Sequence, residues 1–173
     1  MLLERHSIRK YTEKPLPADD VKLILEAALL SPSSKSVRPW QFVVAEDKAV
    51  LEKLSTCKKT GAVSLKTAVM AVVVVAEPEK SDMYVEDASV AALMMQLQAE
   101  ALGIGSCWVQ IAGRYGADDE PAQELVQQCL GIPENLPVIC IITFGYKNEV
   151  RKPVDPEKLL WEKVHIGQWR NEQ

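Results

Sequence analysis

The sequence has few residues that bind transition metals. It contains two histidines, His6 and His165, and its four cysteines form no C-x-x-C pair. Structural zinc sites need four such ligands at short spacings, so we expect no metal site and four reduced thiols. Cys107 and Cys140 lie in apolar stretches, where a thiol packs as a small hydrophobic side chain.

The sequence also lacks a long apolar run and an excess of basic charge. Its longest apolar segment, residues 68–76, is far shorter than the roughly 20 residues that cross a bilayer, and residues 1–3 are too short for a signal-peptide core. The net charge is -4, whereas nucleic-acid binding depends on clustered Lys and Arg. We therefore expect a cytoplasmic protein that binds neither membrane nor nucleic acid.

The composition is otherwise that of an ordinary globular protein. The chain has 173 residues, of which 47% are hydrophobic and 25% charged. It shows no internal repeat, low-complexity stretch or linker. We therefore expect a single domain that spans residues 1–173.

The spacing of apolar residues predicts alternating helices and strands. Residues 69–76 are apolar at both alternating sets of positions, so this strand needs helices over both faces of its sheet. The pattern indicates a layered α/β or α+β fold. The expected helices are residues 18–31, 48–57, 85–102 and 118–130, and the expected strands are residues 40–45, 69–76, 106–111 and 137–146.

The last twenty residues have no assigned element. Trp161 and Trp169 lie there among many charged residues. Since large aromatic side chains are seldom left in water, we expect this tail to pack on another part of the protein or on a second subunit.

The first candidate site is the segment Arg5-His6-Ser7-Ile8-Arg9. In an extended chain alternate side chains share a face, so Arg5, Ser7 and Arg9 point to one side, and His6 and Ile8 to the other. Two guanidinium groups and a hydroxyl suit a phosphate. A solvated basic terminus explains the same residues, and from this segment alone it is the stronger interpretation.

Two further segments are suited to a ligand. Residues 31–40 form a loop dense in hydroxyl groups and bounded by prolines, although a helix end that leads into an edge strand accounts for such residues too. Residues 102–110 contain two glycines, which let backbone N–H groups approach a ligand. Trp108 stands where a G-x-G-x-x-G fingerprint has its third glycine, so this is not the site of a resident dinucleotide.

Together, in this order and at these separations, the three segments resemble the nitroreductase family of FMN-dependent oxidoreductases. The resemblance runs from about Glu4 to Arg151 and includes Glu86-Asp87-Ala88 and Gly145-Tyr146. It implies a mixed, mainly antiparallel sheet flanked by helices, an obligate homodimer, and FMN bound across both subunits at the interface.

The resemblance also implies roles for individual residues. The residues expected to hold the FMN phosphate and ribityl chain are Arg5, His6, Ser7, Arg9, Arg151 and Lys152. The residues expected to border the flavin ring are Trp108, Val109 and Gln110 of one chain and Pro32, Ser33, Ser34 and Ser36 of its partner. The backbone N–H of Val109 or Gln110 is expected to point at flavin N5.

No side-chain acid or base is required, because the flavin carries the hydride chemistry and the protein supplies position and electrostatics. In a ping-pong scheme NAD(P)H reduces FMN and leaves, and a nitroaromatic, quinone or similar small-molecule acceptor then takes the electrons. Two alternatives stay open. One is other flavin chemistry, such as dehalogenation or ring oxidation, and the other is a flavin-binding or storage protein without efficient turnover.

The sequence departs from the family pattern in two places. Ser36 and Arg38 stand where many relatives have Asn and Gln, so amide contacts are not transferred to them; Arg38 either attracts an anion or is a surface charge. The stretch Glu77–Tyr84 is short where longer relatives have a helical excursion. We therefore expect an open site with little selection by acceptor size.

Overall fold

A four-stranded sheet forms the centre of the protein. The computed structural model describes residues 1–169, and its strands are β1 (Trp40–Ala45), β2 (Met70–Ala76), β3 (Ile104–Gln110) and β4 (Val138–Tyr146). They lie in the order β1-β2-β4-β3, with antiparallel pairing throughout. A parallel bridge between Ser7 and Ser106 adds the N-terminal segment to the outer edge of β3. The prediction of a mixed, mainly antiparallel sheet is confirmed.

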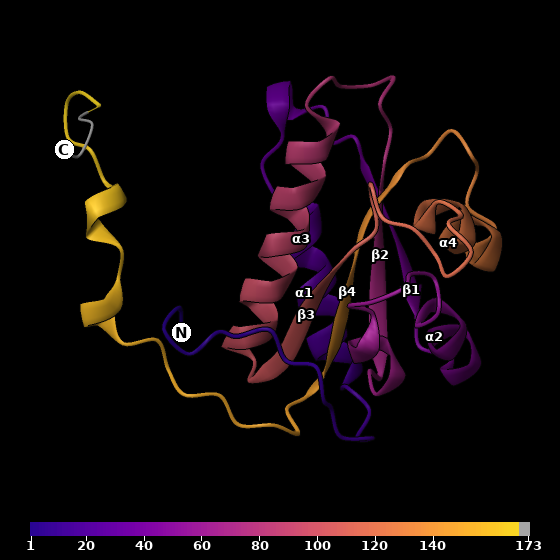
Figure 1. Ribbon diagram of the computed structural model, residues 1–173, viewed down its shortest axis with the longest axis horizontal. Helices are drawn as coiled ribbons and strands as arrows, with labels where there is room; N and C mark the ends of the chain where they lie inside the picture. Colours follow the sequence, from indigo (N-terminus) through magenta and orange to yellow (C-terminus); the bar gives the residue numbers. More distant parts are fainter. Residues whose placement is uncertain (170–173) are drawn as a thin grey trace.

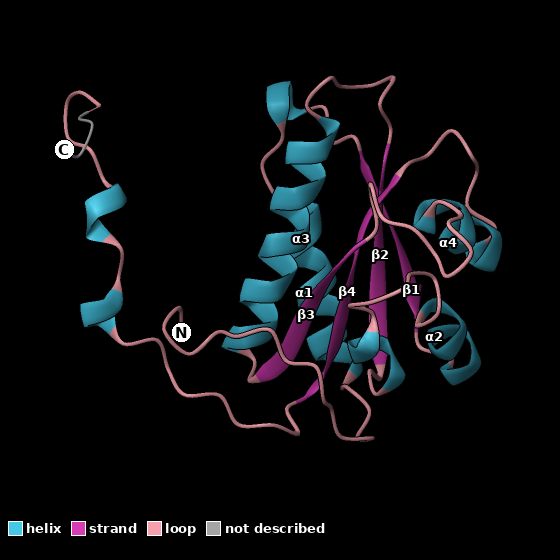
Figure 2. Cartoon of the chain, in the orientation of Figure 1, coloured by secondary structure: helices cyan, strands magenta, loops and turns pink. Residues whose placement is uncertain are grey.

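Helices cover both faces of this sheet (Figure 1). They are α1 (Ala18–Leu29), α2 (Lys48–Leu54), α3 (Tyr84–Ala101) and α4 (Ala122–Leu130). Figure 2 shows α1 and α3 on one side of the strands and α2 and α4 on the other. Short 3-10 turns lie at η1 (Ser34–Ser36), η2 (Val63–Lys66), η3 (Pro156–Lys158) and η4 (Trp161–Lys163).

The central strand β2 divides the core into two halves. All seven of its residues are buried. Val72 and Val74 pack with α1 and α3, whereas Val73 and Val75 pack with α2 and α4. Each buried valine contributes about 1.5 kcal/mol or more to folding. The prediction that this strand needs helices over both faces is confirmed.

Two elements begin two or more residues away from the expected position. β3 begins at Ile104 and not at residue 106, because Gly103, with a φ of 74°, makes the turn by itself. α4 begins at Ala122, after its N-cap residue Pro121, because the preceding acidic residues form a turn in which Asp119 has a φ of 66°. The other elements agree with the expectation to within three residues.

The segment after β4 extends away from the helices and the sheet (Figure 1). Hydrogen bonds tie its start to the N-terminal segment, among them Asn148 N–H to the Lys10 carbonyl O at 2.9 Å and Val154 N–H to the Leu3 carbonyl O at 2.7 Å. Farther on, Trp161 is 69% exposed and Ile166 is 89% exposed. The rest of residues 1–169 leaves these side chains largely uncovered, so packing of the tail on a second subunit stays a prediction.

Two facing glycines make room for the N-terminal segment. Gly105 of β3 pairs with Gly145 of β4. A Cβ atom on Gly145 would lie 2.8 Å from Cβ and Cγ of Tyr11, and one on Gly105 would lie 3.1 Å from Cβ of Ile8. Both distances are shorter than van der Waals contact between carbons. The glycine pair therefore lets Ile8 and Tyr11 lie directly against the backbone of the sheet.

We expect replacement of Gly145 by alanine to displace Tyr11 and to lower the free energy of unfolding by roughly 1–3 kcal/mol, the usual cost of overpacking. Urea denaturation measures the change. In a Tyr11→Ala background the Gly145→Ala replacement should cost much less, because the clash is gone. An equal cost in both backgrounds would show that Tyr11 is not the source of the constraint.

Candidate functional site

The N-terminal segment runs along the free edge of β3. Ile8 N–H donates to the Ser106 carbonyl O at 2.9 Å, next to the bridge between Ser7 and Ser106. Ile8 is buried, Arg9 is exposed, and Arg5 and Ser7 are half-buried. Ile8 therefore faces the core and Arg9 faces away from it, as expected of an extended chain, whereas Arg5, His6 and Ser7 are all half-buried.

Tyr11 fixes this segment to the sheet. Its hydroxyl donates to the Ile8 carbonyl O at 2.6 Å and lies 2.8 Å from Thr143 Oγ1 in β4. Its backbone N–H donates to Thr67 Oγ1 at 3.3 Å. Burial raises the pKa of Tyr11 well above its ordinary value, so the phenol stays neutral and keeps the proton for its hydrogen bond.

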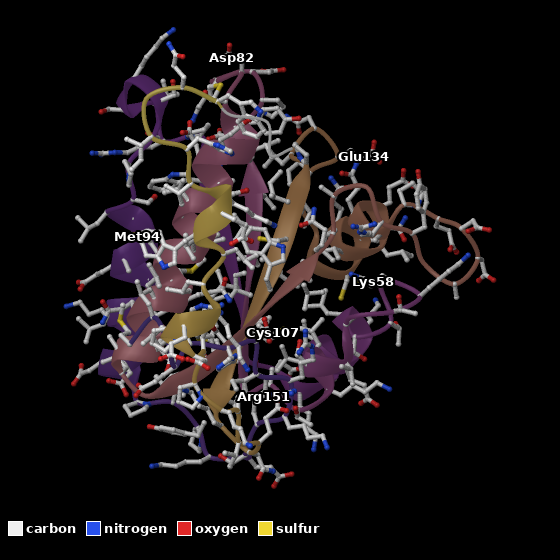
Figure 3. The ribbon with its side chains drawn as sticks, turned by 60° about the vertical axis from the view of Figure 1, so that its left-hand side comes forward. Lys58, Asp82, Met94, Cys107, Glu134 and Arg151 are labelled. Carbon is white, nitrogen blue, oxygen red and sulfur yellow. The ribbon has the colours of Figure 1, made fainter. Side chains whose placement is uncertain are left out.

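A carboxylate joins the two ends of the predicted phosphate site. Glu149 accepts a hydrogen bond from the backbone N–H of Arg9, and its second oxygen accepts one from Arg151 Nη2 at 2.8 Å. Arg151, labelled in Figure 3, thus lies beside the N-terminal segment, and Lys152 follows it in an exposed position. Glu149 was not among the predicted site residues, and its only signal in the sequence is its place two residues before Arg151.

Beyond Ser106, no strand in residues 1–169 pairs with the outer side of β3. In an antiparallel pair the N–H and C=O groups of alternate residues point toward the partner strand and away from it. Ile111 N–H donates to Ile139 O of β4, so the N–H of Val109 also faces β4 and that of Gln110 faces the open edge. Of the two N–H groups predicted near flavin N5, the structure presents the one of Gln110.

The side chains at this end of β3 are held by each other. Trp108 Nε1 donates to Gln110 Oε1 at 2.9 Å, and Gln110 Nε2 donates to the Ala112 carbonyl O at 3.0 Å. Since both polar side chains already have partners, the outward N–H groups of Trp108 and Gln110 are the groups that β3 offers to a ligand.

The serine-rich loop lies at the other end of α3. Ser34 N–H donates to Asp87 Oδ1 at 2.8 Å in the first turn of that helix. Lys35, Ser36 and Arg38 have φ values of 50°, 56° and 55°, a left-handed conformation that is costly for residues other than glycine. Such strain persists where neighbouring contacts hold the backbone, and it clusters at ligand sites.

The length of α3 separates this loop from the N-terminal segment. Asp87 holds the loop at the start of the helix, while Gln96 Nε2 lies near its end and contacts Ser106 Oγ at 3.3 Å. The helix rises about 21 Å between Asp87 and Ala101, at 1.5 Å per residue. Figure 1 shows η1 beside the upper end of α3 and the N-terminus near the lower end. One chain therefore does not bring the two predicted halves of the site together.

The N-terminal half of the site has the chemistry of a phosphate site. Three guanidinium groups lie in or beside it, those of Arg5, Arg9 and Arg151, and such groups bind phosphate oxygens bidentately. The buried Nε2 of His6 has no hydrogen-bond partner in residues 1–169, and an orphaned buried nitrogen is the kind of group that a ligand satisfies. These residues fit the phosphate of FMN.

The described part of the chain contains neither a cluster of metal-ligating side chains nor a membrane-spanning helix. No group of three or more His, Cys, Asp or Glu side chains in residues 1–169 is arranged to hold a metal ion. Within the same residues, no helix has the length and apolar content to span a bilayer. The four cysteines are free, and Cys107 and Cys140 are buried as expected.

Comparison with known proteins identifies the family. The family model described as nitroreductase family matches residues 2–66 and 58–146. The chain belongs to the nitroreductase family. Its match to the family model therefore includes the N-terminal segment, the serine-rich loop and all four strands.

Relatives agree with this assignment along almost the whole chain. A protein of Archaeoglobus fulgidus named for NADH dehydrogenase and NAD(P)H nitroreductase activity is 33% identical over 98% of this chain and 97% of its own. An FMN-dependent nitroreductase from Clostridium difficile has 43% identity and a TM-score of 0.95, covering 97% of this chain and 98% of its own. A Bacteroides fragilis nitroreductase with bound FMN has 28% identity and a TM-score of 0.71, covering 98% of this chain and 95% of its own.

Glu149 should make the folded protein sensitive to acid. The Arg9 N–H, and after it the Arg151 guanidinium, hold the pKa of Glu149 below its ordinary value of 4.5. The stabilisation is therefore complete above that pH and is lost as the pH falls through the lowered pKa of the folded state. Glu149→Gln is expected to be less stable than the wild type at about pH 7 and to lose less stability on going to about pH 3.

Urea unfolding at the two pH values measures this difference. Glu79→Gln, which removes a carboxylate from an exposed loop, is the matched control and should retain the acid sensitivity of the wild type. If Glu149→Gln and the wild type lost the same free energy of unfolding between the two pH values, Glu149 would not be the source of the acid sensitivity.

Proposed function

We propose that this nitroreductase-family protein is an FMN-dependent oxidoreductase that takes hydride from NAD(P)H and passes electrons to a nitroaromatic, a quinone or a similar small-molecule acceptor. One observation carries the proposal. The N-terminal segment lies on the edge of β3 with its cationic side chains at one end, and the open N–H groups of Trp108 and Gln110 follow at the other. The names of the relatives, FMN-dependent nitroreductase and NAD(P)H nitroreductase, support the cofactor and the donor.

Different residues along that edge of one chain bind the phosphate and the ring of the flavin. Arg5, Ser7 and Arg9, joined by Arg151 and Lys152, hold the phosphate through charge-assisted hydrogen bonds. The outward N–H of Gln110 would donate to the flavin ring and stabilise the electron density that reduction adds there. When bound, FMN supplies the hydride chemistry, so the chain needs no acid–base triad and no permanent nicotinamide site. Donor and acceptor use the same open face in turn.

We further propose that residues 1–173 act as a single domain within a homodimer. The separation of the serine-rich loop from the phosphate residues supports a second copy, because a flavin on β3 of one chain then meets Pro32, Ser33, Ser34 and Ser36 of its partner. Exposed apolar side chains on α3 and in the tail support the same conclusion: Val90 is 38% exposed, Leu93 47% and Trp161 69%. We expect the dimer to act in the cytoplasm, where its four free cysteines stay reduced.

The purified protein should be yellow, and its flavin absorption should bleach with NADH or NADPH and recover when an acceptor is added. Arg5→Ala and Arg9→Ala should each weaken FMN binding roughly ten- to hundredfold, because a hydrogen bond to a charged group contributes about 1.5–3 kcal/mol. Lys10→Ala removes an exposed neighbouring charge and is the control. Titration of each apoprotein with FMN gives the dissociation constants.

The outcomes of these measurements are distinct. A colourless protein that does not bind added FMN would overturn the proposed function. A yellow protein that is reduced but transfers no electrons to any acceptor would be a flavin-binding protein. Equal FMN affinity in the Arg5→Ala, Arg9→Ala and Lys10→Ala proteins would show that the N-terminal segment is a solvated basic terminus and does not bind the phosphate.

Charge placed on the outer face of α3 should disrupt assembly. Leu93→Glu puts a carboxylate among exposed apolar side chains and, by desolvation, is expected to shift the dimer toward monomer and to lower flavin content with it. Val63→Glu, at a 53% exposed position in η2, is the matched control and should stay dimeric. Sedimentation velocity measures the populations; a dimeric Leu93→Glu protein would show that α3 lies outside the interface.

A further inference from the structure

A lysine occupies the far end of the β3 edge, away from the phosphate residues. Lys58 lies in the loop after α2, and its Nζ donates to the Gln110 carbonyl O at 2.9 Å. This carbonyl belongs to the residue whose N–H faces the open edge. Figure 3 shows Arg151, Cys107 and Lys58 in succession, from the lower end of the view toward its right side. Lys58 is therefore at the flavin-ring end of the proposed site.

The loop that carries Lys58 is held in place by its neighbours. Lys59 N–H donates to the Tyr115 carbonyl O at 3.1 Å, and Lys59 Nζ forms an ion pair with Asp119 at 2.6 Å. Gly61 adopts a φ of 82°, and a Cβ atom at that position would lie 3.4 Å from Lys58 Nζ. The fixed loop and the hydrogen bond to the Gln110 carbonyl O keep the ammonium group at the edge of β3.

The charge of Lys58 is not neutralised by a carboxylate. Six cationic side chains of the described residues have a carboxylate partner: Lys22, Lys59, Lys80, Lys147, Arg151 and Lys158. The others, Lys58 among them, form no ion pair within those residues. In residues 1–169 no ion pair joins a carboxylate to Lys58 or to its neighbour Arg114. Burial lowers the pKa of Lys58, and the positive charge of Arg114 lowers it further. A half-buried ammonium with a second cation beside it and no counter-ion favours an anionic ligand.

We propose that Lys58 binds the negative charge of the electron acceptor, so that the site prefers aromatic acceptors that carry a carboxylate or a similar anionic group. This inference rests on the proposed function, because it requires flavin on the same edge of β3. The anionic group pairs with the ammonium while the aromatic ring lies over the flavin. Selection then depends on charge, which is compatible with an open site that selects little by size.

The test uses the FMN-loaded protein and two probes of nearly equal shape, benzoate and benzamide. Binding of each is followed by the change in flavin absorption. The wild type is expected to bind benzoate more tightly than benzamide. Lys58→Met should weaken benzoate binding about tenfold, the loss expected for one charge-assisted contact, and should leave benzamide binding unchanged. Lys58→Arg should retain the preference for benzoate.

Lys59→Met is the matched control, since it removes the neighbouring positive charge, which already pairs with Asp119. It should bind both probes like the wild type. Steady-state kinetics with 4-nitrobenzoate and 4-nitrobenzamide provide a second readout. Lys58→Met should raise KM for the anionic acceptor alone and leave kcat close to that of the wild type.

Several results would overturn the inference. They are a wild type without preference for benzoate, an equal loss of both probes in Lys58→Met, and a loss of benzoate binding in Lys59→Met as large as in Lys58→Met. An equal loss of both probes would mean that Lys58 only supports β3. All of these results are obtained on a protein that holds FMN, so they are distinct from failure of the proposed function, in which no flavin is bound.

Discussion

The packing of residues 7–11 against the edge of β3 is the constraint on which the proposed site depends. It requires the facing glycines 105 and 145, because any side chain there would displace Ile8 or Tyr11. The N-terminal segment pairs with β3 only as far as Ser106, so the edge of β3 is covered at one end and open at the other. An open strand edge is normally a hazard for aggregation. Here we interpret it as a surface kept for a ligand.

The sequence predicted the helices and strands whose signals are carried by residues close together in the chain. The β-branched run of β2 identifies a buried strand, and the composition of α3, rich in Ala, Met, Leu and Gln without Gly or Pro, identifies a central helix. Both signals lie in neighbouring residues. The Arg-x-Ser-x-Arg alternation also gave the correct facing of Ile8. By contrast, Asp119 at positive φ gave no signal, since its conformation is set by the turn around it.

The parts of the site that the sequence did not reveal are contacts between distant residues. Glu149 meets Arg9 across 140 positions of the chain, Asp87 meets Ser34 across 53, and Lys58 meets Gln110 across 52. None of these residues is unusual in its own segment. Their roles arise from the way the sheet brings its ends together. For the same reason, the left-handed backbone of Lys35, Ser36 and Arg38 gives no signal in the sequence, because the loop is held at the start of α3 by a contact with distant Asp87.

The separation imposed by α3 has a thermodynamic consequence. If each flavin contacts β3 of one chain and the serine-rich loop of the other, cofactor binding and subunit association are reciprocally linked. Flavin then strengthens the dimer by the same free energy by which the dimer strengthens flavin binding, and the affinity for FMN depends on protein concentration. Newly made chains would bind FMN cooperatively with dimer formation. In a dilute apoprotein both the affinity for FMN and the association of the subunits would be weak.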